Sequence, residues 1–362
     1  MNYVMEKRYI SLDIFRGLCV AMMILANNPG LWEMTFPIFK HAPWNGCTPT
    51  DLVFPSFLFC VGVSMAFSLA RFDSLDRSAL GKIFKRGVLL FLIGMFINAF
   101  PFEKGWLETY RFMAVFQRIA LCYMLASVLA LWLKTPKKIL CAVGILSALH
   151  VAILVIFAGP EGAFTLEGCA ARHIDEAIFG TNHLYPWYFF ADGTQAPFDP
   201  EGLLGVLTGA CTALLGYLIG GLLRQERPVA EKLTAMYSFA AISLALSQIL
   251  NIWVPINKPL WSASYVLYAG GWSMFILAFI TWLTDVKGIV KPFTPFRALG
   301  MNPLSIFVLA ALIQKVVWWT EWDYGAVFGA NEWTSLLYAL IFLAVHLLIA
   351  MVLYKKKIII KL

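Results

Sequence analysis

The sequence predicts an all-α protein, a polytopic transmembrane helix bundle of about ten spans with both termini in the cytoplasm. Its 362 residues are 60% hydrophobic and only 14% charged, and its mean hydropathy is +0.75, which excludes an ordinary soluble globular domain. Its apolar runs reach the length of about 20 residues that crosses the hydrocarbon core. Its lysines and arginines gather in alternate linkers, as they do in multi-pass membrane proteins.

Ten apolar runs have the length of a membrane span. They lie near residues 12–31, 52–70, 84–101, 111–133, 139–158, 202–223, 233–251, 264–283, 298–318 and 334–354. Barrel strands are excluded, because they would be about half as long and would alternate apolar with polar residues. No small-residue cleavage site follows the first run, so we expect it to be retained as a span rather than removed as a signal peptide.

The distribution of cations predicts the orientation. Twenty lysines and arginines lie in the N-terminal segment, the even-numbered linkers and the C-terminal tail, whereas the odd-numbered linkers hold five: Lys40, Lys104, Arg111, Arg172 and Lys258. The positive-inside rule therefore places the odd-numbered linkers outside. The net charge of +7 does not predict a nucleic-acid partner, because the cations do not follow one amphipathic face. The expected environment is the lipid bilayer.

One external linker, residues 159–201, is much longer than the others and shows no helical period. We expect it to cap an outer site of a single transmembrane domain covering residues 1–362, because long ordered loops in compact proteins are commonly functional. Cys47 and Cys169 lie on this side, where an oxidising compartment could join them in a disulfide. The sequence has no metal-ligand spacing, so no metal site is expected.

The first span carries two features that suggest a site. SLDIFRG places Asp13 and Arg16 three residues apart on one helical face, either as a buried ion pair that fixes packing or as a site for a ligand phosphate. NNPG, residues 27–30, should end the helix near the outer face. Exposed backbone at membrane depth needs protein or a water-filled cavity around it, so a pocket near Asn27 is expected, with a plain helix end as the alternative.

The next segment, KHAPWNGCTPTD, gathers polar side chains where the chain re-enters the membrane. It contains His41, Trp44, Asn45 and Asp51, and His41 is the natural acid or base. By composition alone, a single interfacial histidine is more often a solvated loop residue than a catalyst. Trp44 alone would suit an interfacial aromatic belt.

Other ionisable side chains fall inside apolar runs. Arg118, with Gln117 beside it, could bind a pyrophosphate or pair with a carboxylate such as Asp13. His150 and His346 are interpreted as packing residues with satisfied hydrogen bonds. Each of these groups is costly at membrane depth unless it is paired or faces water.

The motifs SLDIFRG, ILANNPG, KHAPWNG, TDLVFPSFLFCVG and FQRIALCY together resemble the heparan-alpha-glucosaminide N-acetyltransferase family. Further matching motifs follow in the same order: DEAIFGTNHLYP, FDPEGLLG, PINKPLWSASYVL, TDVKG and FRALGMNPLSIF. The resemblance covers nearly the whole chain. The sequence lacks the large luminal N-terminal region and extra leading helix of the lysosomal enzyme and looks like a bacterial member. We therefore expect the protein to lie in the inner membrane, with its active site facing the periplasm or exterior.

The resemblance implies acetyl-CoA as donor, a terminal glucosamine amine as acceptor, His41 as the catalytic residue and Asn27 as its neighbouring asparagine. It also implies a homodimer. Two mechanisms stay open: His41 acts as general base while Asn27 stabilises the oxyanion, or His41 is acetylated first. A cytosolic donor would reach through the bundle, and its phosphates should meet cations at one mouth, for which Arg16, Arg118 and the basic cytoplasmic linkers are candidates. Asp13 and Gln117 lie close to these two arginines in sequence and are expected to contribute to the same donor site.

The acceptor site is predicted on the external face. The candidates there are Trp44, Asn45, His183, Asn257, Lys258 and Trp261. The long linker adds residue types that suit a sugar ring and its hydroxyls: Asp175, Glu176, Tyr185, Trp187 and Asp199. Two other readings stay open: a solute transporter, because a broken first span and buried charges also suit a solute pathway, and an acyltransferase for another envelope glycan.

Overall fold

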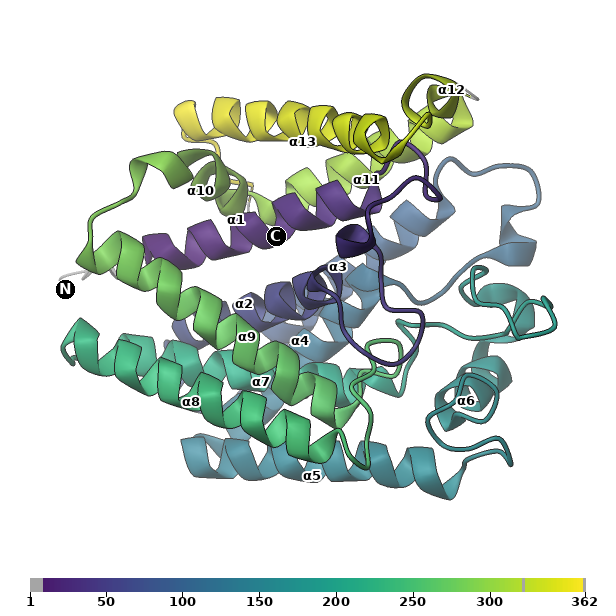
Figure 1. Ribbon diagram of the computed structural model, residues 1–362. Helices are drawn as coiled ribbons and strands as arrows, with labels where there is room; N and C mark the ends of the chain where they lie inside the picture. Colours follow the sequence, from purple (N-terminus) through teal and green to yellow (C-terminus); the bar gives the residue numbers. More distant parts are fainter. Residues whose placement is uncertain (1–8, 321–322, 361–362) are drawn as a thin grey trace.

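The computed structural model describes residues 9–320 and 323–360, and every regular element there is helical apart from two isolated β-bridges. The long helices are α1 (Ile10–Asn27), α2 (Val53–Ser68), α3 (Arg77–Ala99), α4 (Val115–Leu133), α5 (Pro136–Ile156), α7 (Gly205–Arg224), α8 (Val229–Leu250), α9 (Ala263–Thr281), α11 (Pro303–Trp319) and α13 (Glu332–Lys355). The short ones are α6 (Ala170–Phe179), α10 (Thr294–Met301), α12 (Tyr324–Phe328), the 3-10 turns η1 (Pro37–Phe39), η2 (Pro49–Leu52), η3 (Trp106–Thr109), η4 (Thr181–His183) and η6 (Lys291–Phe293), and the π-helical turn η5 (Trp282–Val286). The predicted all-α helix bundle is confirmed (Figure 1).

Eight of the helices in the described ranges are long and apolar enough to cross a membrane, and the bent pair α10–α11 makes a ninth candidate. The chain is therefore a multi-pass membrane protein. The third predicted span, near 84–101, lies in α3, which carries four cations in its first half: Arg77, Lys82, Lys85 and Arg86. Those charges keep α3 out of the apolar set, so this measure gives eight or nine spans rather than ten.

The ninth predicted span, 298–318, is not one straight helix. It breaks after Asn302, where the segments Lys291–Met301 and Pro303–Trp319 meet at 77°. Pro303 has no backbone N–H to continue the helix. The Asn302 side chain donates to the carbonyl of Ile358 at 2.9 Å and accepts from the N–H of Ile360 at 2.8 Å, so it binds the chain after α13 instead.

The burial of the helices divides an inner group from an outer one. In α1 and in the stretch Pro49–Ser68, 72% of the apolar window is buried, against 22% in α5 and 28% in α8 and α13. The outer helices expose apolar residues such as Ile145, Leu246 and Leu348. These surfaces suit lipid, and the helices that carry the candidate site lie inside them.

Small residues let α2 and α7 approach each other closely. A Cβ placed on Gly62 would lie 1.8 Å from the carbonyl oxygen of Ala213, and one on Gly216 would lie 2.1 Å from that of Phe59. Only glycine fits at these positions. The small residues of α7 thus make a tight helix contact within the chain.

Linkers predicted on opposite sides lie at opposite ends of the bundle. In Figure 1 the connection after α1 and helix α6 lie on the right, whereas the start of α1 lies on the left. Arg224 donates to the carbonyl of Ala66 near the end of α2, and Lys232 donates to that of Leu223 near the end of α7. Lys7, Arg8 and Lys361, which entered the orientation prediction, lie outside the described residues.

The long external linker is more ordered than its sequence predicted. It contains α6, whose buried face presents Ala170, Ala171 and Asp175, and the turn η4. The expectation of no helix here was wrong, because ten residues are too few for a helical period to stand out among glycines and prolines. The linker packs as a small satellite cluster around Phe198, Leu204 and Leu260.

Candidate active site

A cavity of about 320 Å³ opens at the end of the bundle formed by the external linkers. Six parts of the chain contribute to it: the end of α1, the segment before α2, the linker before α4, the long linker, the turn before α9, and α11. Its lining residues include Asn27, Trp32, His41, Asp51, Phe54, Arg111, Tyr185, Tyr188, Glu201, Lys258, Trp261 and Phe307. The predicted pocket near Asn27 is present, and Asn27, His41, Lys258 and Trp261 all line it.

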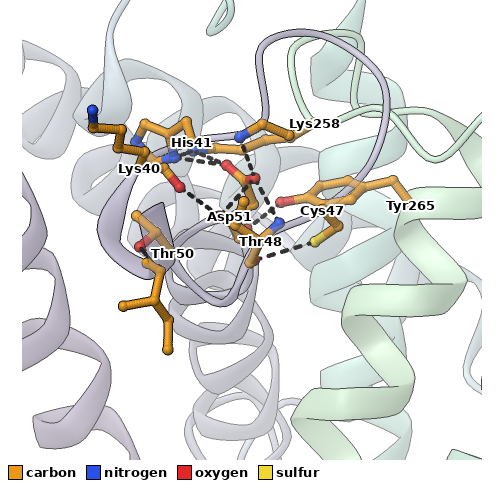
Figure 2. A network of polar contacts seen from close by, with 10 residues as sticks. Lys40, His41, Cys47, Thr48, Thr50, Asp51, Lys258 and Tyr265 are labelled. Atoms are coloured by element: carbon orange, nitrogen blue, oxygen red, sulfur yellow. Dashed lines mark hydrogen bonds and ion pairs between the residues drawn. The ribbon is translucent and has the colours of Figure 1, made fainter. Parts of the chain in front are cut away.

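His41, Asp51 and Lys258 form a contact network on one wall of this cavity (Figure 2). Nδ1 of His41 lies 2.6 Å from Oδ1 of Asp51 and 3.0 Å from Nζ of Lys258, and Lys258 lies 3.2 Å from the same carboxylate oxygen. The carboxylate favours a proton on Nδ1. The other ring nitrogen, Nε2, has no hydrogen-bond partner among the described residues, and 46% of the histidine side chain is exposed.

The local sequence explains why Asp51 points at His41. Thr48 caps the turn η2, Pro49 occupies its first position, and Asp51 stands at its third, which makes a capping box. Oδ2 of Asp51 accepts from the N–H groups of Ala42 and Thr48, both at 3.0 Å, and from the Thr48 hydroxyl at 3.1 Å. The carboxylate is thus fixed by backbone on one oxygen and presents the other to the imidazole.

A second charged network lies on the wall formed by the long linker. Arg111 donates to both oxygens of Asp199, at 2.7 and 2.6 Å, and to Oε2 of Glu201 at 2.5 Å. Its guanidinium also lies over the ring of Tyr185, 4.6 Å from the centroid. Burial would lower the pKa of Arg111, but the two carboxylates raise it above its usual value. The arginine is therefore charged and rigid.

Glu201 is the acidic member of this network that lines the cavity. Burial acts to raise its pKa, yet the cations Arg111, Arg118 and Lys258 lower it below the usual value. Glu201 is accordingly ionised at neutral pH. Since Lys258 also contacts His41, the two charged walls lie within electrostatic reach of each other.

Three predicted acceptor residues hold loops together instead of lining the cavity. The indole N–H of Trp44 donates to the carbonyl of Phe164 at 2.6 Å, and its ring packs on Tyr188. The amide of Asn257 donates to Oδ1 of Asn45 at 3.1 Å. These contacts tie the segment that carries His41 to the long linker and to the turn that carries Lys258.

His183 is also outside the cavity lining. Its Nδ1 lies 2.8 Å from the carbonyl oxygen of Tyr110, next to Arg111, and its ring packs on Phe112. It therefore braces the segment that carries the arginine. Trp261 does line the cavity, and its indole N–H donates to the Thr212 hydroxyl at 3.1 Å.

The residues predicted near the donor lie away from the cavity lining. Arg16 donates to Asp13 at 2.6 Å and to the carbonyl of Gly300 at 3.0 Å, roughly 16 Å along α1 from Asn27 at 1.5 Å per residue. Arg118 and Gln117 are fully buried. Arg118 donates to the carbonyl of Gly202, the neighbour of Glu201.

Two functional candidates had no assigned role in the sequence: Arg111 and Glu201. Arg111 had one usable signal, since it is among the few cations on the side predicted to be poor in them. Glu201 stood inside the motif FDPEGLLG without a partner. Their pairing joins residues 90 apart in sequence, which no spacing argument within one helix could reveal.

Neither a disulfide nor a cluster of metal-ligand side chains is found among the described residues. Cys47 and Cys169 are free thiols, so they do not form the disulfide considered from the sequence. Within the described ranges, no set of three or more His, Cys, Asp or Glu side chains comes together as metal ligands.

Comparison with known proteins gives a consistent match. A family model described as "Heparan-alpha-glucosaminide N-acetyltransferase, catalytic" matches residues 8–226, a segment that includes His41, Asp51, Arg111 and Glu201. The chain is 30% identical to the heparan-alpha-glucosaminide N-acetyltransferase of Mus musculus over 95% of this chain and 59% of that protein. For the protein of that name from Homo sapiens, the identity is 29% over 97% of this chain and 59% of the relative. The chain thus spans about three fifths of the length of the curated relatives it matches.

Proposed function

Because this chain belongs to the heparan-alpha-glucosaminide N-acetyltransferase family, we propose that it transfers an acetyl group from acetyl-CoA to the amine of an amino sugar, glucosamine or a terminal glucosaminide. The single observation that carries the proposal is the His41–Asp51 pair in the cavity, with Nδ1 of the imidazole bound and Nε2 without a partner. That arrangement prepares one nitrogen to take a proton or to attack a carbonyl.

The chemistry needs a neutral amine, a polarised thioester carbonyl and an acceptor for a proton, all within hydrogen-bond reach. In the first route, Nε2 of His41 takes the amine proton as the C–N bond forms, the side-chain amide of Asn27 donates to the oxyanion, and the C–S bond breaks to give CoA thiolate, which receives that proton. Asp51 then stabilises the imidazolium that forms. Ordered addition of both substrates before product release would support this route.

In the second route, Nε2 attacks the thioester and CoA leaves before the amine attacks the acetyl-imidazole. Ping-pong kinetics would support this route. Both routes use the same residues and the same free nitrogen, so the proposal of His41 as the catalytic residue does not depend on the choice.

We further propose that the cavity faces the periplasm or exterior of a bacterial inner membrane, because it lies at the cation-poor end of the bundle. Acetyl-CoA from the cytosol would then extend its pantetheine arm between the helices, with Arg16 and Arg118 as the proposed contacts near its path. A homodimer also stays a proposal from the family resemblance. Removing Arg16 should raise the KM for acetyl-CoA if this path is correct.

The experiment that tests the function uses the purified full chain with acetyl-labelled acetyl-CoA and glucosamine. Formation of labelled N-acetylglucosamine supports the proposal. The rival function is solute transport, favoured by the charged groups that line an open cavity in a membrane protein. Sugar flux into vesicles without labelled product would refute the enzyme and support the transporter. A preference for longer acyl-CoA donors would show that another acyl group, and not acetyl, is transferred.

A further inference from the structure

Glu201 lines the cavity, and one of its carboxylate oxygens has no hydrogen-bond donor among the described residues. Arg111 donates to Oε2 of Glu201 at 2.5 Å, and Oε1 accepts no hydrogen bond from the described residues. Only 13% of the Glu201 side chain is exposed. An ionised carboxylate that is held by an arginine and largely shielded from bulk water is a strong acceptor for a ligand N–H.

Arg111 contacts two carboxylates on this wall. Both oxygens of Asp199 accept from Arg111, and burial raises the pKa of that carboxyl above its usual value although Arg111 opposes the rise. Asp199, with a side chain 1% exposed, takes the bidentate position. Glu201 accepts one bond from Arg111 through Oε2, which leaves Oε1 for a cationic ligand group.

The Glu201 carboxylate and the His41 imidazole belong to the same cavity. His41 and Glu201 line the same cavity, and Lys258 both contacts His41 at 3.0 Å and lowers the pKa of Glu201. A cavity of about 320 Å³ stands at the small end of ligand sites, which run from roughly 300 to 1,000 Å³. It suits one sugar ring rather than a long chain, so a group bound at Glu201 stays close to His41.

We propose that Glu201, held by Arg111, is the acceptor-binding carboxylate, which takes the ammonium group of the incoming amino sugar and so selects amines over hydroxyls at that ring position. The bound ammonium releases one proton to water before the neutral amine attacks. The inference rests on the proposed function for its substrate class, but it concerns binding alone. It gives Arg111 a positioning task, because the guanidinium fixes the direction in which Oε1 points. Tyr185 stacks on Arg111 from the far side and restrains it.

Glucosamine and glucose provide a matched pair of ligands, since they differ only by an amine or a hydroxyl at one carbon. Their affinities for the detergent-purified full chain would be measured by calorimetry at about pH 6, where the amine is protonated. The wild-type protein should prefer glucosamine. Glu201→Gln should weaken glucosamine binding by about tenfold or more, as expected for a lost charge-assisted hydrogen bond, and should leave glucose binding unchanged.

Glu108→Gln serves as the matched control, because Glu108 is an exposed carboxylate three residues before Arg111 and lies outside the cavity lining. It should retain the wild-type preference. Equal weakening of both sugars in Glu201→Gln, or an unchanged preference, would overturn the proposal. If Glu201→Gln does not fold, Glu201→Asp keeps the charge and should preserve a preference for glucosamine at lower affinity, whereas loss of the preference in a folded Glu201→Asp would also overturn it.

The binding test is independent of turnover. A wild-type protein that prefers glucosamine in calorimetry but forms no N-acetylglucosamine from acetyl-CoA would refute the proposed function and leave the role of Glu201 standing. If the wild type acetylates glucosamine while Glu201→Gln keeps the full binding preference, the proposed function stands and the role of Glu201 is refuted.

Discussion

The two ends of the bundle use similar charged residues in different ways. At the His41 end, cations pair with carboxylates from distant parts of the chain, as Lys258 does with Asp51 and Arg111 with Glu201. At the opposite end, Arg16 pairs with Asp13 within one helix, and other cations donate to backbone carbonyls: Lys232 to Leu223 at 2.7 Å and Arg224 to Ala66 at 3.0 Å.

Cavity volume alone does not identify the candidate site. The opposite end has the larger cavity, about 890 Å³, against about 320 Å³ around His41. What distinguishes the smaller cavity is the imidazole of His41, which has a partner carboxylate on Nδ1 and no hydrogen bond on Nε2 from the described residues. The comparison teaches that the pairing of charged groups, more than open volume, marks the place where chemistry is prepared.

The largest expected effect comes from His41→Ala. Removing the imidazole deletes the proton acceptor or the nucleophile, so the acetylation rate should fall at least 10²–10⁴-fold, the usual contribution of a general acid–base group. Labelled transfer from acetyl-CoA to glucosamine measures the rate. Because the His41 side chain is nearly half exposed, the thermal midpoint and the affinity for acetyl-CoA should change little, and retained turnover would remove His41 from the mechanism.

Asp51→Asn and Asp13→Asn sharpen the comparison, because each replaces a buried aspartate that pairs with a cation. Asp51→Asn should lower turnover by roughly 10²-fold or more, since the amide favours the wrong imidazole tautomer and does not stabilise the imidazolium. Asp13→Asn should lower the thermal midpoint while turnover stays within a few-fold, because its pair with Arg16 lies within one helix.

Kinetics with varied acetyl-CoA separate the two outcomes for Asp13. An unchanged KM for the donor would leave the Asp13–Arg16 pair as a packing element. A raised KM would assign Arg16 to the donor, as the sequence also suggested. Equal loss of turnover in Asp51→Asn and Asp13→Asn would contradict the view that only the His41 end carries the reaction.

Asn27→Ala should have a smaller effect than His41→Ala. Asn27 is the last residue of α1 and lines the cavity, so its amide can reach an oxyanion formed near His41. Loss of one such donor commonly costs about 10²–10³ in turnover. Steady-state kinetics should show a lower kcat with little change in the KM for acetyl-CoA, whereas a change in KM alone would make Asn27 a binding residue.

The sequence predicted those features that depend on local pattern. The helix bundle follows from the length of the apolar runs, and the Asp13–Arg16 contact follows from the helical spacing of three residues. The end of α1 at Asn27 follows from the proline and glycine after it. Each needs only a short window of the chain.

Long-range pairs escaped prediction for a physical reason. The contact between His41 and Lys258 joins residues 217 apart, and nothing in either local sequence specifies the partner. The bend at Asn302 depends on the tail after α13, which supplies the backbone groups that its side chain binds. Arg118 was predicted from its chemistry alone, and its contact with the carbonyl of Gly202 depends on the fold of the long linker.

The smallest expected effect tests Asp175, which lies at the His41 end in α6 with no cation in direct contact. Its Oδ1 accepts from the N–H of Leu203 at 2.9 Å, while Oδ2 has no hydrogen-bond partner among the described residues. Burial raises the pKa of Asp175 to about 7, and the nearby Asp199 adds to this while Arg118 opposes it.

The sign of the effect follows from proton binding. Below about pH 7 the folded protein keeps a proton on Asp175 that the unfolded chain releases near pH 4, so this group makes the folded state less stable as the pH rises from about 4 to 7. Asp175→Asn keeps the acceptor for Leu203 and removes the titration. The thermal midpoint of the wild type should therefore fall relative to Asp175→Asn between about pH 5 and 7 and run parallel to it at higher pH. Parallel curves over the whole range would mean that Asp175 has no raised pKa and is ionised in the folded protein. A carboxylate at the His41 end would then be ionised without a cation in direct contact, unlike Asp51 and Glu201.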